Sequence, residues 1–122
     1  MFIKNLNDCE EFTANDGCRI RELLHPANDP VKLPYSIAIA RVGAGKQSYM
    51  HKLQQDEVYY ILQGRGQIHI EDEIKSVTTG DIVVILADSA QWIENTGEGE
   101  LMFAAIVSPP WTREGDMRLD GE

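Results

Sequence analysis

GKQSYMHKLQQDEVYYILQG, the stretch at residues 45–64, decides how this chain folds, together with GDIVVILADSAQWIEN at residues 80–95. Each stretch starts at a glycine, where the chain can turn, and continues into runs that mix apolar and polar side chains. In a strand, residues two apart share a face. His51, Glu57 and Gln91 are therefore each expected on a strand face shared with apolar neighbours.

Strand-like runs recur along the rest of the chain, separated by Gly, Pro, Asn and Asp. Apart from a possible short turn near the N-terminus, no 3.6-residue periodicity persists over eleven residues. Many short strands with turns at this spacing are typical of an antiparallel sandwich or barrel. The predicted strands cover residues 18–24, 35–42, 47–53, 57–62, 67–71, 82–86, 92–94 and 101–107.

The composition of the chain limits the kinds of binding partner that we expect. Its 122 residues fit one domain, with a formal net charge of −9 and 43% hydrophobic residues. Such an acidic chain argues against nucleic acid or an anionic membrane as the main partner, because both favour a basic face. The N-terminal residues resemble neither a signal peptide nor a membrane span. We therefore expect a cytoplasmic protein in which Cys9 and Cys18 are reduced thiols.

The two stretches resemble the paired motifs of the cupin superfamily, G-x5-H-x-H-x3-4-E-x6-G and G-x5-P-x-G-x2-H-x3-N. The spacing from Gly45 to Gly64 and from Gly80 to Asn95 matches these motifs. The resemblance implies an all-β fold, an antiparallel jelly-roll barrel. Some motif chemistry is replaced, however. Leu53 and Gln91 stand where the family has histidines, and Leu86 and Asp88 stand where it has Pro and Gly.

The resemblance also implies that the motif strands face the barrel interior. His51, Glu57 and Gln91 would then converge on one point as ligands of a divalent metal ion, such as Zn, Mn, Fe or Ni. Each residue has a second interpretation. His51 would be a hydrogen-bonded interior histidine, Glu57 a buried carboxylate paired with His51 or Tyr59, and Gln91 an amide that contacts a ligand or bonds within the core.

Three further residues are candidates for a role in or near the site. Tyr59 follows Glu57 with one residue between, which resembles cupin lyases in which a tyrosine near the metal acts as the base; the alternative is an aromatic side chain packed in the barrel. Tyr49 is expected near the site as a polar neighbour. His69 alternates with Ile68 and Ile70, so it should point away from the core.

Several functions remain compatible with these motifs. The resemblance implies a cupin barrel that binds a divalent metal, a small polar ligand or both. It is compatible with isomerase, lyase or dioxygenase activity on an unassigned substrate. The alternatives are a binding or sensing barrel without catalysis and a structural barrel that has lost its metal. We expect one domain over residues 1–122, with a core at 35–107, an N-terminal extension at 1–34 and a polar tail at 108–122. A homodimer is expected, paired through one sheet and an exchanged strand at residues 18–24.

Overall fold

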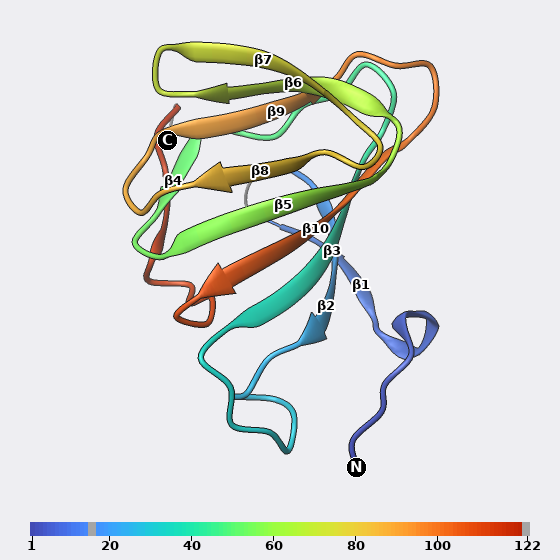
Figure 1. Cartoon of the computed structure of the whole chain (residues 1–122), viewed down its shortest axis with the longest axis vertical. Helices are drawn as coiled ribbons and strands as arrows, with labels where there is room; N and C mark the ends of the chain where they lie inside the picture. The colour runs from blue at the N-terminus through green and yellow to red at the C-terminus, as the bar shows by residue number, and fades with distance from the viewer. Residues whose placement is uncertain (15–16, 121–122) are drawn as a thin grey trace.

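Two antiparallel sheets face each other and form a barrel (Figure 1). The computed structural model describes residues 1–14 and 17–120. The predicted all-β antiparallel barrel is confirmed. The six-stranded sheet runs in the order β1 (Glu11–Thr13), β2 (Arg19–Leu24), β3 (Ser36–Val42), β10 (Leu101–Ser108), β5 (Asp56–Gln63) and β8 (Ile82–Ile85). The five-stranded sheet runs in the order β11 (Asp116–Arg118), β4 (His51–Leu53), β9 (Gln91–Asn95), β6 (Arg65–Ile70) and β7 (Glu73–Thr78).

Each of the eight predicted strands corresponds to an observed one, with ends shifted by a few residues. Three observed strands, β1, β7 and β11, were not predicted. In β7 only Val77 is buried, so the strand lacks the apolar alternation that reveals a half-buried strand. β1 and β11 have three residues each, too few for a period to be recognised.

The N-terminal segment belongs to the same sheet as the motif strands. A single turn of 3₁₀ helix, η1 (Leu6–Asp8), precedes β1. β2 pairs with β1 on one side and with β3 on the other. The strand expected to be exchanged between two chains is therefore paired along both edges within its own chain, and β1 is the edge of the sheet. Within residues 1–14 and 17–120 the structure has no helix long and apolar enough to cross a membrane.

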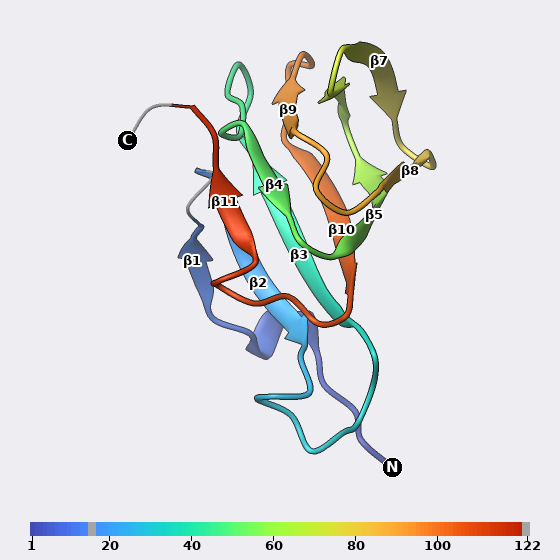
Figure 2. The same cartoon turned by 90° about the vertical axis from the view of Figure 1, so that its left-hand side faces the viewer.

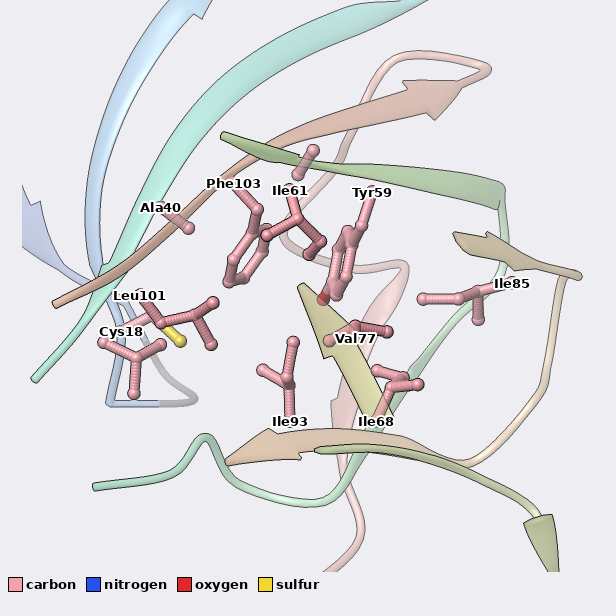
Figure 3. Close-up of a cluster of buried hydrophobic side chains, with 12 residues drawn as sticks. Cys18, Ala40, Tyr59, Ile61, Ile68, Val77, Ile85, Ile93, Leu101 and Phe103 are labelled. Carbon is pink, nitrogen blue, oxygen red and sulfur yellow. The ribbon is translucent and has the colours of Figure 1, made fainter. Parts of the chain in front are cut away.

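A packed hydrophobic core occupies one part of the interior (Figure 3). Tyr59 and Phe103 lie at its centre, with ring centroids 4.3 Å apart. Around them, β5 to β10 contribute side chains that are almost fully buried: Ile61, Ile68, Val77, Ile85, Ile93 and Leu101. Burial of each such side chain stabilises the fold by about 1.5–3 kcal/mol. This core fixes the positions of β5 and β9, the strands that carry Glu57 and Gln91.

The C-terminal segment is part of the barrel rather than a loose tail. β11 pairs with β4 (Figure 2). Before it, the Trp111 backbone N–H donates to the Ser36 hydroxyl oxygen at 2.9 Å, and the Trp111 carbonyl lies 2.8 Å from Nε2 of His25. Residues 111–118 are thereby held against the side of the barrel where β11, next to β4, forms the edge of the five-stranded sheet.

Gly66 permits close packing between two strands of the five-stranded sheet. It lies in β6, opposite Asn95 of β9, and its φ is not positive. A Cβ at this position would lie 2.2 Å from the Glu94 carbonyl oxygen and 3.2 Å from the Leu101 side chain. Both neighbours belong to the packed part of the barrel, so neither can move freely.

We therefore predict that Gly66→Ala lowers the free energy of unfolding by about 2 kcal/mol or more, because β6 and β9 must separate to admit the methyl group. Gly99→Ala is the matched control, since a Cβ there meets nothing within 4 Å. Urea unfolding followed by tryptophan fluorescence measures both. Equal stability of the two variants would show that the contact is not tight.

Candidate functional site

A cavity of about 390 Å³ is lined by residues of both sheets, including residues of β2, β3, β4 and β11. Figure 2 shows that β11 and β4 face β2 and β3 on this side of the barrel. The wall of the cavity is largely apolar. The apolar lining includes Phe12, Ile20, Leu53, Phe103, Val107 and Trp111. Three of the residues singled out in the sequence, His51, Glu57 and Tyr59, also line it, and they come from β4 and β5. The cavity is therefore largely apolar, with a group of polar side chains from the first motif on β4 and β5.

His51 is buried on β4, directly opposite Gln91 of β9. Its Nδ1 lies 3.2 Å from the Tyr49 carbonyl oxygen. A carbonyl can only accept, so Nδ1 carries the proton and donates this hydrogen bond. In the neutral ring, Nε2 then holds the lone pair. His51 is thus fixed as a residue that can accept a hydrogen bond, or bind a metal, through Nε2.

Gln91 bridges the other two polar residues of the site. The Tyr59 hydroxyl donates to Oε1 of Gln91 at 3.0 Å, and Nε2 of Gln91 donates to Oε1 of Glu57 at 2.8 Å. All three side chains are buried, with Gln91 only 1% exposed. The amide thus holds the hydroxyl and the carboxylate in a fixed relation. We call His51, Glu57, Tyr59 and Gln91 the polar cluster.

The parity argument from the sequence holds for the motif strands. His51 and Leu53 of β4 are buried, as are Glu57, Tyr59 and Ile61 of β5. On β9 the same is true of Gln91, Ile93 and Asn95. Strand periodicity alone therefore identified which side chains share a face.

The polar cluster offers fewer ligand atoms than a resident metal ion requires. Structural and catalytic sites for zinc-like ions use three or four nitrogen, sulfur or carboxylate ligands. In the part of the chain that the structure describes, no three His, Cys, Asp or Glu residues are grouped to hold a metal ion. His51 and Glu57 supply two donors, and the oxygen of Gln91 already accepts from Tyr59. This set does not fit a tightly held metal ion.

Other residues of interest lie outside the cavity. The Tyr49 ring lies against the guanidinium of Arg118 at 3.5 Å. His69 points away from the core, as expected, but it is covered rather than exposed. Its ring stacks on Trp92 at 3.5 Å, and its Nε2 lies 3.2 Å from Glu94. Neither Tyr49 nor His69 is part of the cavity lining.

Several charged or aromatic residues of the cavity were missed by the sequence reasoning, among them Glu22, Trp111, Arg113 and Asp116. Glu22 shares the inward face of β2 with Ile20, a parity signal that was available in the sequence. The other three come from the segment around β11, which was expected to be a tail. Their position depends on how that segment folds back, and no local pattern encodes it.

Comparisons with known proteins agree with this architecture. A family model described as the Cupin domain matches residues 38–107. An uncharacterised protein of Methanocaldococcus jannaschii is 36% identical over 104 residues, covering 84% of this chain and 82% of that protein.

Two solved structures are similar in fold. The oxalate decarboxylase of Lactobacillus farciminis superposes with a TM-score of 0.81 at 21% identity, over 93% of this chain but only 34% of that one. The polyketide cyclase of Streptomyces resistomycificus gives 0.82 at 12% identity, over 100% of this chain and 87% of that one. At these identities the two structures show the fold alone.

We predict that Gln91→Leu lowers the free energy of unfolding by about 2 kcal/mol, because the substitution removes the buried amide that donates to Glu57 and accepts from Tyr59. The control is Gln67→Leu on β6, where the side chain is only partly buried. Urea unfolding at neutral pH gives both values. A Gln91→Leu variant no less stable than Gln67→Leu would mean that the bridge contributes little.

Proposed function

This chain belongs to the cupin family, and from that premise we propose that its barrel binds a small organic ligand in the interior cavity, through direct hydrogen bonds to the polar cluster. The observation that carries the proposal is the pairing of an apolar cavity of about 390 Å³ with three buried residues of the polar cluster, His51, Glu57 and Tyr59, in its wall. Ligand sites in proteins commonly measure about 300–1,000 Å³ and combine apolar walls with a few convergent polar groups.

The hydrogen-bonding character of the cluster selects the ligand group. Nε2 of neutral His51 and the carboxylate of Glu57 are both acceptors. A ligand hydroxyl or N–H group would therefore satisfy them, whereas a ligand carbonyl would not. Because the amide of Gln91 fixes Glu57 from one side, the carboxylate is held ready for a ligand rather than reorganised by it.

For Tyr59 we propose a positioning role in place of the base expected from the sequence. Its hydroxyl donates to an amide oxygen, which accepts hydrogen bonds but does not take up protons near neutral pH. The bond orients Gln91, and Gln91 in turn orients Glu57. Tyr59 thus supports the acceptor that meets the ligand.

A divalent metal ion held by His51, Glu57 and Gln91 is the second candidate. It is favoured by the fact that His51 and Glu57 line the same cavity and that Nε2 of His51 carries a lone pair. Such an ion would need Gln91 to offer its amide oxygen as a weak third ligand while that oxygen also accepts from Tyr59. Direct ligand binding requires no such change, so we favour it.

The ligand proposal predicts that 2-naphthol, an aromatic alcohol, binds the wild-type protein with one site per chain. His51→Leu should weaken this binding about tenfold, because the acceptor for the hydroxyl is lost, and should leave the binding of naphthalene unchanged. The control is His69→Leu, since His69 lies outside the cavity. Isothermal titration calorimetry measures each affinity.

Two further measurements separate the candidate functions. Ala38→Phe, which fills the cavity from β3, should abolish the binding of both compounds. Elemental analysis of protein purified without a histidine tag should find far less than one metal ion per chain. One tightly bound ion per chain, lost in His51→Leu, would favour the metal candidate. Binding of 2-naphthol that survives Ala38→Phe would refute the cavity as the site.

We also propose a homodimer, formed through the outer face of the six-stranded sheet rather than by an exchanged strand. Large apolar side chains stand 39–66% exposed on neighbouring strands of that face: Tyr60, Leu62, Ile82, Val84 and, directly after β8, Leu86. Together they expose on the order of several hundred Å², at the upper end of what a monomer shows. That area is close to the ~800 Å² that each partner gives a standard interface.

A second copy of the chain is the occupant that suits this face. The outward side chains of β5, β8 and β10 at its centre are uncharged, among them Val58, Val84 and Ala104. Two chains of net charge −9 can therefore meet there without placing like charges together. Two identical sheet faces can also stack in the aligned manner of β-sandwiches.

Light scattering coupled to size-exclusion chromatography is expected to show a dimer at micromolar concentration. Val84→Glu should convert it to a monomer, because two buried carboxylates would face the interface. Ile74→Glu, at an apolar residue 59% exposed on the other sheet, is the control and should stay dimeric. A wild-type monomer, or a Val84→Glu dimer, contradicts the proposal.

A further inference from the structure

Arg113 stands out among the charged residues of the cavity. It lies in the segment between β10 and β11 and lines the cavity together with Trp111 and Asp116. Among the described residues, Arg113 makes no ion pair. An arginine that borders an apolar cavity without a protein partner can bind an anionic group of a ligand.

Most other arginines of the chain form ion pairs with carboxylates. Arg41 pairs with Glu11 and Glu100, and Arg19 pairs with Glu100 at 2.5 Å. Arg118 pairs with Asp120 at 2.9 Å. In a chain with 20 acidic and 11 basic residues, carboxylate partners are abundant, yet none within the described residues reaches Arg113.

The acidic residues of the cavity are held by neutral donors. Glu22 accepts from the Asn28 amide at 2.6 Å, and Asp116 accepts from the Trp111 indole at 3.1 Å. Glu57 accepts from Gln91. Each carboxylate thus has a hydrogen-bond donor of the protein, whereas the guanidinium of Arg113 lacks an acceptor among the described residues. An anionic group of a bound ligand would therefore meet Arg113 without competition from a carboxylate of the described residues.

We propose that the ligand is an amphipathic organic carboxylate, a compound with a hydroxyl or N–H group at the polar cluster, an apolar body and a carboxylate that binds Arg113. The inference rests on the proposed function, which supplies the first two parts of the ligand. It adds the third part and names Arg113 as the residue that selects the anion. The bidentate guanidinium suits a planar carboxylate because its two N–H groups match the two oxygens.

The test uses a series of naphthalene compounds. 2-Naphthol carries the apolar body and the hydroxyl, and 6-hydroxy-2-naphthoate adds the carboxylate at the far end. The wild-type protein should bind 6-hydroxy-2-naphthoate about tenfold more tightly than 2-naphthol, and this advantage should shrink as salt is added, because Arg113 is exposed. Isothermal titration calorimetry at low and high ionic strength measures both.

Arg113→Gln should reduce the ratio of the affinities for 6-hydroxy-2-naphthoate and 2-naphthol from about ten to about one. Arg65→Gln is the matched control, since Arg65 is also exposed and also makes no ion pair among the described residues, but does not line the cavity. 2-Naphthylmethylamine, a cation with the same body, tests the opposite charge and should bind more weakly than 6-hydroxy-2-naphthoate.

The outcomes separate the two proposals. Failure of every compound to bind would overturn the proposed function itself. Binding of 2-naphthol with no gain from the carboxylate, or a gain that persists in Arg113→Gln, would overturn only the assignment of the anion to Arg113. Tighter binding of the amine than of the hydroxynaphthoate would overturn it as well, because the acidic residues of the cavity would then decide the ligand charge.

Discussion

The buried carboxylate of Glu57 is the constraint around which the interior of this barrel is arranged. A carboxylate taken out of water destabilises the fold by several kcal/mol unless it is hydrogen-bonded or paired with a charge. In a metal-binding barrel a divalent ion can supply that charge. Here the amide of Gln91 donates to the carboxylate, and the hydroxyl of Tyr59 holds the amide. The carboxylate of Glu57 is thus stabilised at least in part by a neutral donor.

The two replaced histidine positions have different effects on the site. Leu53 is 3% exposed and adds apolar wall to the cavity. Gln91 keeps a polar group at its position and donates a hydrogen bond to Glu57. One replacement thus makes the cavity less polar, and the other turns the remaining carboxylate into a hydrogen-bonded acceptor. Both changes suit an organic ligand better than an ion.

The sequence allowed much of the fold to be predicted, because its signals there are local. Glycine spacing and period-two alternation indicated the strands, and the resemblance to the cupin motifs implied that His51, Glu57 and Gln91 face the interior. The hydrogen-bond partners of those residues were harder to predict from the sequence. The bridge from Tyr59 through Gln91 depends on how β5 faces β9 across the barrel, a tertiary relation that spans 32 residues of sequence. Gln91 as a hydrogen-bonding amide was only one of the interpretations that the sequence left open.

The difference between local signals and tertiary contacts also explains why the sequence predicted a polar tail where the structure has the segment around β11. Its composition is polar, and its strand has three residues, so it carries no pattern of its own. Its order comes from other parts of the chain, through pairing with β4 and the contacts of Trp111 with Ser36 and His25. Those contacts also bring Arg113 to the cavity. A ligand that binds Arg113 would therefore strengthen the attachment of this segment to the barrel, because binding and docking of the segment stabilise each other. Under this proposal, the residues that select the ligand and those that close this side of the barrel would belong to one cooperative unit.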